Sequence, residues 1–294
     1  MARNKHAEPP LAARPKDQYR HISGVYARYW TMGEGEALLL VHGLGGSVDH
    51  WRYAIEPLAA RFQVYASDLP GFGRSDKPRE HPSFAAQAEF LKNLMLGFGI
   101  SRFHLVGHGA GGTIALHLAY WFPYMVHKLI LVAPLGFGRE VHWSYRLQSL
   151  PLLGELMTLP SRLNTRQRVV RLFCRYDLVT RECINTYYRL ARLPGASRFL
   201  LAAMRQSVDA SGIRREVVQS AQSEARGITA PTMIVWGRED RILPVAQAET
   251  ARQLIASAQL RILEECGHLP MVEKAQEFNE LLLGFLSDAP DQSV

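Results

Sequence analysis

The segment Gly-His-Gly-Ala-Gly at residues 107–111 has the spacing of a catalytic turn but lacks its nucleophile. The pattern Gly-x-Ser-x-Gly after a buried strand makes a sharp strand-to-helix turn that presents a serine hydroxyl at the edge of a sheet. Both flanking glycines are present, and the largely apolar residues 103–106 precede them. The middle position is Gly109, which has no side chain. Attack on a substrate by a side chain at position 109 is therefore excluded.

Four other stretches accompany this turn in a familiar order. They are VHGLGG at residues 41–46, DLPGFGRS at 68–75, VWGREDRILP at 235–244 and CGHLP at 266–270. Together with the turn they resemble the α/β-hydrolase family of the capped serine-hydrolase type, over about residues 19 to 287. This resemblance implies a mostly parallel, doubly wound α/β sheet with an inserted helical cap. It also implies an esterase or acyl hydrolase for small hydrophobic substrates.

The resemblance places the catalytic acid at Asp240 and the catalytic base at His268, so that elbow, acid and histidine follow in the family's order. A neutral imidazole can take a proton from a nucleophile and return it to a leaving group. The aspartate would fix the tautomer and orientation of that imidazole. Glu239 is the rival acid, but the family position, four residues before Pro244, favours Asp240. The alternatives are a loop histidine bonded to backbone and a surface aspartate.

The resemblance also implies an oxyanion hole made by the backbone N–H groups of Leu44 and Ala110. Neither donor depends on a serine, so the hole can be intact. In the family's turn Asp68 has a structural role, and we assign it no catalytic one. Cys266 is interpreted as an inert buried thiol, and His108 is expected to point away from the pocket.

Three functions are compatible with Gly109. The first is a hydrolase-family protein for esters or similar acyl substrates that is inactive or strongly impaired in covalent acyl-enzyme chemistry. The second is a non-covalent enzyme in which the Asp240–His268 pair is a general base for water activation, a lyase step or an isomerase step. The third is a non-catalytic protein that binds a ligand or a partner in the capped pocket.

Hydrophobic periodicity predicts the elements that position these residues. Strands are predicted at residues 37–41, 62–66, 103–106, 128–133, 232–236 and 260–263, helices at 49–60, 82–98, 110–121, 245–255 and 273–286, and an edge hairpin or strand pair at 19–31. Continuous apolar runs are typical of strands that are buried on both faces. Strands that alternate with helices favour a mostly parallel doubly wound sheet.

The alternation stops between residues 135 and 227, where helical spacing dominates. We interpret this segment as a helical cap over the carboxyl ends of the strands, where ligands bind in open α/β sheets. The predicted domains are therefore a core at 19–134 and 228–294 and a cap at 135–227. Residues 1–18, which combine prolines with charges, are predicted to be a disordered leader.

The net charge of +7 is concentrated in one segment. Residues 139–226 hold 15 arginines, no lysine and seven carboxylates, a net charge of +8. This segment could attract anionic ligands or associate weakly with an anionic membrane surface, although a solvated helical face is the favoured interpretation. No nucleic-acid-binding motif is evident. The predicted partner is a small hydrophobic acyl or aromatic compound.

The remaining composition indicates an ordinary globular enzyme or binding protein. The three cysteines (Cys174, Cys183 and Cys266) are odd in number and widely spaced, which favours reduced thiols and a cytoplasmic protein. No dinucleotide or phosphate-loop motif and no cluster with metal-ligand spacing is found, so neither cofactor nor metal is predicted.

Overall fold

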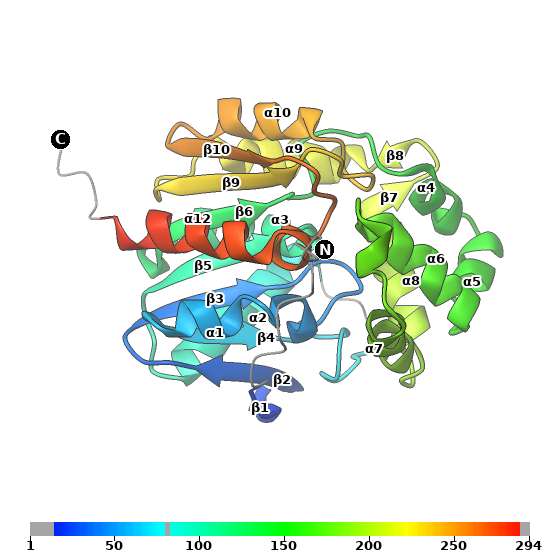
Figure 1. Cartoon of the computed structure of the whole chain (residues 1–294), viewed down its shortest axis with the longest axis horizontal. Helices are drawn as coiled ribbons and strands as arrows, with labels where there is room; N and C mark the ends of the chain where they lie inside the picture. The colour runs from blue at the N-terminus through cyan, green and yellow to red at the C-terminus, as the bar shows by residue number, and fades with distance from the viewer. Residues whose placement is uncertain (1–14, 80–82, 289–294) are drawn as a thin grey trace, which may run out of the picture.

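The computed structural model describes residues 15–79 and 83–288, and its centre is an eight-stranded sheet (Figure 1). The strands follow the order β1-β2-β4-β3-β5-β6-β9-β10. They are β1 (Gln18–Ile22), β2 (Val25–Met32), β3 (Glu36–Val41), β4 (Phe62–Ser67), β5 (Phe103–His108), β6 (Val126–Val132), β9 (Thr232–Gly237) and β10 (Ala258–Leu263). The pairs β1–β2 and β2–β4 are antiparallel, and all other pairs are parallel. The predicted fold class is confirmed.

Apolar packing covers both faces of this sheet, which explains the apolar runs of β3 and β9. One core lies between the sheet and α2 (Phe84–Gly97), α3 (Ala110–Trp121), α9 (Arg215–Ala225) and α10 (Ala246–Leu254). The other lies between the sheet and α1 (Ile55–Ala59), α11 (Pro270–Glu273) and α12 (Ala275–Ser287). Two short 3₁₀ helices, η1 (Val48–Trp51) and η2 (Pro123–Met125), complete the core. This three-layer packing holds the ends of the parallel strands in fixed positions.

The segment after β6 forms a separate group of helices, which lies on the right in Figure 1. It contains α4 (Trp143–Ser149), α5 (Leu153–Thr158), α6 (Arg162–Leu172), η3 (Tyr176–Leu178), α7 (Arg181–Ala191), α8 (Ala196–Ser207) and the small hairpin of β7 (Val208–Asp209) and β8 (Gly212–Ile213). We call α4–α8 and this hairpin the cap. The sequence did not predict the hairpin.

Two boundaries differ from the sequence-based domain prediction. Helix α9 lies inside the predicted cap at 135–227, yet it packs against α3 and α10 of the core. At the amino end, Asp17 bonds to Trp30 and β1 begins at Gln18, so ordered structure starts before residue 19. The rest of the predicted leader, residues 1–14, lies outside the described residues. In the part that the structure describes, no helix has the length and apolarity needed to cross a membrane.

Candidate active site

The turn at residues 107–111 connects β5 to α3 as the motif predicts, and its flanking glycines allow a close approach of backbone. A Cβ on Gly107 would lie 2.4 Å from the carbonyl oxygen of Gly111, and one on Gly111 would lie 2.2 Å from that of His42. Real Cβ atoms do not make such contacts, so the packing of α3 on the sheet requires glycine at both positions. The turn is therefore built into the core rather than into a surface loop.

Gly109 has a backbone conformation that side chains rarely adopt, with φ 55° and ψ −122°. Its N–H donates to Val132 O (2.9 Å) and its carbonyl accepts from Leu135 N (3.1 Å), which fixes the turn between neighbouring segments. A Cβ at this position would nevertheless have ordinary contacts, 3.5 Å from His268 Nε2 and 3.7 Å from Gly43 Cα. Position 109 thus has space for a side chain that would face the imidazole.

His268 and Asp240 are brought together from the loops that follow β10 and β9. His268 Nδ1–H donates to Asp240 Oδ2 at 2.7 Å, and both residues are buried. The second carboxylate oxygen of Asp240 accepts from the backbone N–H groups of Ile242 (2.8 Å) and Leu243 (3.0 Å). With Nδ1 committed to the carboxylate, Nε2 of a neutral imidazole is the free acceptor. Glu239, the rival acid, instead accepts from Cys266 N.

Leu44 lies in the loop after β3, and Ala110 is the first residue of α3. Both line one cavity with Gly109 and His268. Within the described parts of the chain, neither backbone N–H donates to another protein group. Amides in such positions can stabilise a developing oxyanion.

This cavity, which we call the inner cavity, lies between core and cap. The core supplies residues at or after the ends of β3, β5, β6, β9 and β10. The cap supplies mainly apolar or aromatic side chains, among them Tyr145, Leu172 and Tyr187. The carboxyl edge of the sheet therefore carries an enclosed, largely apolar cavity at the predicted site residues.

A second cavity, which we call the outer cavity, adjoins the first and shares Leu44, Tyr145, Leu172 and Tyr187 with it. Its described lining contains Lys77 and Arg168 but no carboxylate. Three of its lining polar atoms, namely Arg168 Nε, Thr165 Oγ1 and Gln148 Oε1, are buried without a hydrogen-bond partner in the described structure. Burial lowers the pKa of the Arg168 guanidinium, with Arg171 adding to the effect.

Glu273 links the histidine loop to the cap, and the sequence analysis missed it. Its Oε1 accepts from Gly267 N (2.9 Å), next to His268, and its Oε2 accepts from Cys174 N (2.7 Å) and Arg175 N (3.2 Å). The backbone N–H of His268 also donates to Leu172 O at 2.8 Å. Burial raises the pKa of Glu273 to about 6. Its two cap partners lie 99 and 98 residues away in sequence, so no local pattern marks the link to the cap.

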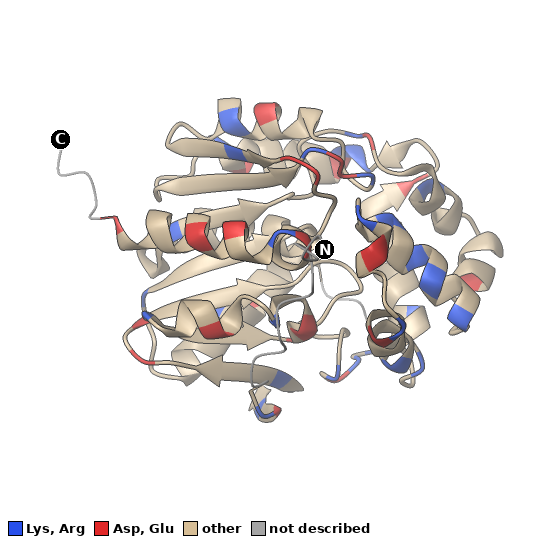
Figure 2. Cartoon of the chain, viewed as in Figure 1, with Lys and Arg blue, Asp and Glu red and all other residues tan. Residues whose placement is uncertain are grey.

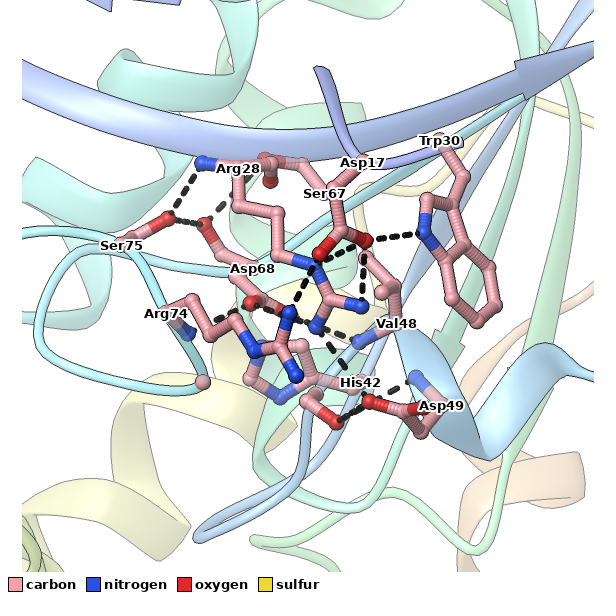
Figure 3. Close-up of polar contacts among 12 residues, drawn as sticks. Asp17, Arg28, Trp30, His42, Val48, Asp49, Ser67, Asp68, Arg74 and Ser75 are labelled. Carbon is pink, nitrogen blue, oxygen red and sulfur yellow. Dashed lines mark hydrogen bonds and ion pairs between the residues drawn. The ribbon is translucent and has the colours of Figure 1, made fainter. Parts of the chain in front are cut away.

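Asp68 supports the loop that carries Leu44 (Figure 3). Its Oδ1 accepts from Val48 N (2.7 Å), and its Oδ2 accepts from Arg74 N (2.7 Å) and Arg28 Nη1 (3.3 Å). Burial raises the pKa of Asp68, and the charge of Arg28 opposes this effect. Asp68 lies in the core, away from the inner cavity, so its contacts agree with the structural interpretation.

Arg28 is the cation of this network. It also contacts Asp17 Oδ1 (2.7 Å) and Asp49 Oδ2 (3.3 Å), and its own side chain is almost completely buried. The three carboxylates come from the segment before β1, from η1 and from the end of β4. The network therefore joins the edge of the sheet to the loops beside the cavity.

The expectation that His108 points away from the pocket is wrong. His108 is among the residues that line the inner cavity, its ring lies 4.6 Å from that of His268 between centroids, and its Nε2–H donates to His268 O at 2.8 Å. His50 also lines the cavity, where its Nε2 pairs with Tyr187 Oη of the cap (2.9 Å). Cys266 is fully buried, and burial raises the pKa of its thiol.

One group of potential metal ligands occurs in the described residues, at the opposite end of the sheet. Glu36, His104 and His127 lie at the amino ends of β3, β5 and β6. His104 Nε2–H donates to Glu36 Oε2 at 2.9 Å, so two of the three donor atoms are already paired. This group does not contribute to either cavity.

A model of the family described as alpha/beta hydrolase fold matches residues 36–275. This match covers most of the chain and includes every predicted site residue. The chain belongs to this family.

Individual relatives include hydrolases. The 2-hydroxy-6-oxo-6-phenylhexa-2,4-dienoate hydrolase of Comamonas testosteroni is 30% identical over 274 residues, which cover 91% of this chain and 93% of that enzyme. The dihydrolipoyllysine-residue acetyltransferase component of the acetoin cleaving system of Cupriavidus necator is 34% identical over 266 residues, covering 90% and 67%. A meta-cleavage product hydrolase from Pseudomonas fluorescens, solved with acetates bound, has a TM-score of 0.79 at 26% identity and covers 92% of this chain and 97% of its own.

Proposed function

We propose that this chain has a hydrolase-type site for small hydrophobic acyl or aromatic compounds, without a covalent nucleophile. In this proposal His268, oriented by Asp240, is the base, and the N–H groups of Leu44 and Ala110 are the oxyanion donors. The base acts on a water molecule in the space that faces Gly109. Chemistry through an acyl-enzyme on residue 109 is absent.

The observation that carries the proposal is the position of His268 Nε2, 3.5 Å from where a Cβ of residue 109 would lie. The buried Asp240 holds the other ring nitrogen at 2.7 Å. A hydroxymethyl group at position 109 would therefore meet an oriented acceptor, and a water in the same space would meet it too. This arrangement favours a hydrolase that lacks one group over a binding pocket with unrelated polar residues.

The substrate that fits best is a hydrophobic compound with a carboxylate group. The outer cavity is mostly apolar, yet it contains Arg168 and Lys77 without a described carboxylate in its lining. A buried guanidinium pairs well with a carboxylate, which offers two acceptors in one plane. The relative from Comamonas testosteroni is named for a phenyl-substituted dienoate, a substrate of this chemical class.

The experiment compares the protein with its Gly109→Ser variant on short and medium p-nitrophenyl esters. We expect at least about a thousandfold higher kcat/KM for the variant, because loss of the nucleophile in a serine protease reduces turnover by a still larger factor. Gly109→Ala is the matched control, since it adds the Cβ without the hydroxyl. Its kcat/KM should equal that of the parent protein. His268→Ala in the Gly109→Ser background should abolish the gain.

A folded Gly109→Ser variant that binds a substrate analogue but is no faster than Gly109→Ala would contradict the assignment. Residual activity of the glycine form that vanishes in His268→Ala would support water activation by the dyad. Equal residual activity with and without His268 would exclude it.

A further inference from the structure

The outer end of the cap exposes an unusual number of apolar side chains. We call residues 143–163 the cap tip. Among the described residues, 14 large apolar side chains are exposed, and half of them belong to this segment. They are Trp143, Leu147, Leu152, Leu153, Leu156, Leu159 and Leu163. Such a concentration marks an interaction site, since scattered exposed apolar residues are normal but clusters of them are not.

Helix α5 in the cap tip has its apolar side turned outward. Gly154 and Thr158 are buried, whereas Leu153 and Leu156 are exposed, the latter to 61%. A Cβ on Gly154 would lie 2.2 Å from the carbonyl oxygen of Gln148, so the inner side of α5 is closely packed with small residues. In an ordinary surface helix the leucines would face the core. The outward leucines are therefore fixed by tight packing on the other side.

Leu152, just before α5, reinforces this arrangement. Its side chain is 83% exposed, and its backbone has φ 67° and ψ −48°. A positive φ is unfavourable for a leucine, typically by about 1–3 kcal/mol. The surrounding structure therefore holds a large apolar side chain in water at the cost of backbone strain.

Positive charge surrounds this apolar surface. Helix α6 begins inside the cap tip, and its Arg162 and Arg166 are exposed and form no ion pair with a carboxylate of the described residues. Glu155 is the one carboxylate in residues 143–163. It is already paired with Arg205 at 2.8 Å. Figure 2 shows blue bands along these cap helices.

From these observations we propose that the cap tip docks onto an anionic lipid surface, with its leucines in the acyl boundary and its arginines at the headgroups. Leucine and tryptophan beside arginine are the residues that interfacial helices use. Figure 1 places α5 at the end of the molecule away from the sheet. A second copy fits less well, because both caps carry the same positive excess.

The test measures co-sedimentation of the full chain with vesicles of phosphatidylcholine alone and with equimolar phosphatidylglycerol. We expect binding only to the anionic vesicles, and loss of binding at high salt. Replacing Leu152, Leu156 and Leu163 together by serine should weaken binding about tenfold or more, because the inserted apolar area is lost. Leu96→Ser is the matched control, since Leu96 is an exposed leucine of the core, and it should bind like the parent.

Arg162→Gln with Arg166→Gln should also weaken binding, whereas Arg252→Gln with Arg261→Gln in the core should not. Circular dichroism melting checks that each variant is folded. The proposal is overturned if the parent chain does not sediment with anionic vesicles, if it binds neutral vesicles equally well, or if Leu96→Ser has the same effect as the triple change. A parent dimer in sedimentation velocity that the triple change abolishes, without vesicle binding, would assign the tip to self-association instead. None of these outcomes depends on turnover at Gly109.

Discussion

Position 109 combines a demanding backbone conformation with the residue that tolerates it best. The turn holds φ at 55°, a value that glycine adopts without strain and other residues adopt only with strain. The conformation does not depend on a side chain at 109, because Gly107, Gly111 and the bonds to neighbouring strands impose it. A serine would therefore enter a turn that is already shaped for it.

Gly109→Ser should consequently lose stability while it gains activity. We expect the free energy of unfolding to fall by about 1–3 kcal/mol, the typical cost of a strained backbone conformation. Gly109→Ala should lose a similar amount, because the strain comes from the Cβ. Urea unfolding followed by circular dichroism measures both, and a serine variant as stable as the glycine form would contradict the strain argument.

Arg168 should decide between charged and neutral ligands. Calorimetric binding of phenylbutanoate is expected to be stronger than that of phenylbutanamide. Arg168→Gln should weaken carboxylate binding about tenfold or more, because hydrogen bonds to charged groups contribute about 1.5–3 kcal/mol. Arg166→Gln is the matched control, since Arg166 lies on the same helix but is exposed. If the parent protein binds phenylbutanoate and phenylbutanamide equally well, Arg168 does not contact the ligand.

At the scale of elements, two carboxylates hold loops in place from outside the cavity. Glu273 joins the histidine loop to the segment after α6, and Asp68 joins the loop after β3 to the turn after β4. Each accepts backbone N–H groups with both of its oxygens. Loops whose amides are bonded in this way need no regular structure to stay in position.

Asp68→Asn should destabilise the protein and misplace the Leu44 loop. An amide replaces one acceptor oxygen by an NH₂ group that faces a backbone N–H, and Arg28 loses one of its counter-charges. We expect a loss of about 1–3 kcal/mol in unfolding free energy. In the Gly109→Ser background, kcat should fall more than KM changes. Asp76→Asn, at an exposed position of the same turn, should leave the unfolding free energy and kcat unchanged.

Glu273 should give the stability a distinct dependence on pH. Burial raises its pKa from 4.5 to about 6, so the folded protein holds this proton more tightly than the unfolded chain. Its contribution is complete below pH 4.5 and is lost as the pH rises to about 6, by about 2 kcal/mol in total. The difference in unfolding free energy between the parent and Glu273→Gln should therefore change across this window. The exposed Glu277→Gln variant should show no such change, and parallel pH profiles for the parent and Glu273→Gln would contradict the prediction.

At the scale of the whole molecule, the sequence predicted the core better than the cap. Buried parallel strands produce apolar runs, so the strands up to β6 were predicted to within two residues at either end. Helix α9 shows where this reasoning failed, because its spacing marks a helix but does not say whether α3 or the cap packs against it. Asp240 and His268 could be predicted from the short motifs around them. Glu273 and Arg168 could not, because their importance depends on partners and burial that only the folded chain creates.

The contacts that align His268 are shared with the cap, and this has a thermodynamic consequence. His268 N–H bonds to Leu172 O, and Glu273 bonds to the histidine loop and to residues 174 and 175 at once. Moving the cap away would break these bonds and release the base from its position. By reciprocity, anything that favours the closed cap also favours the aligned imidazole, and to the same extent in free energy.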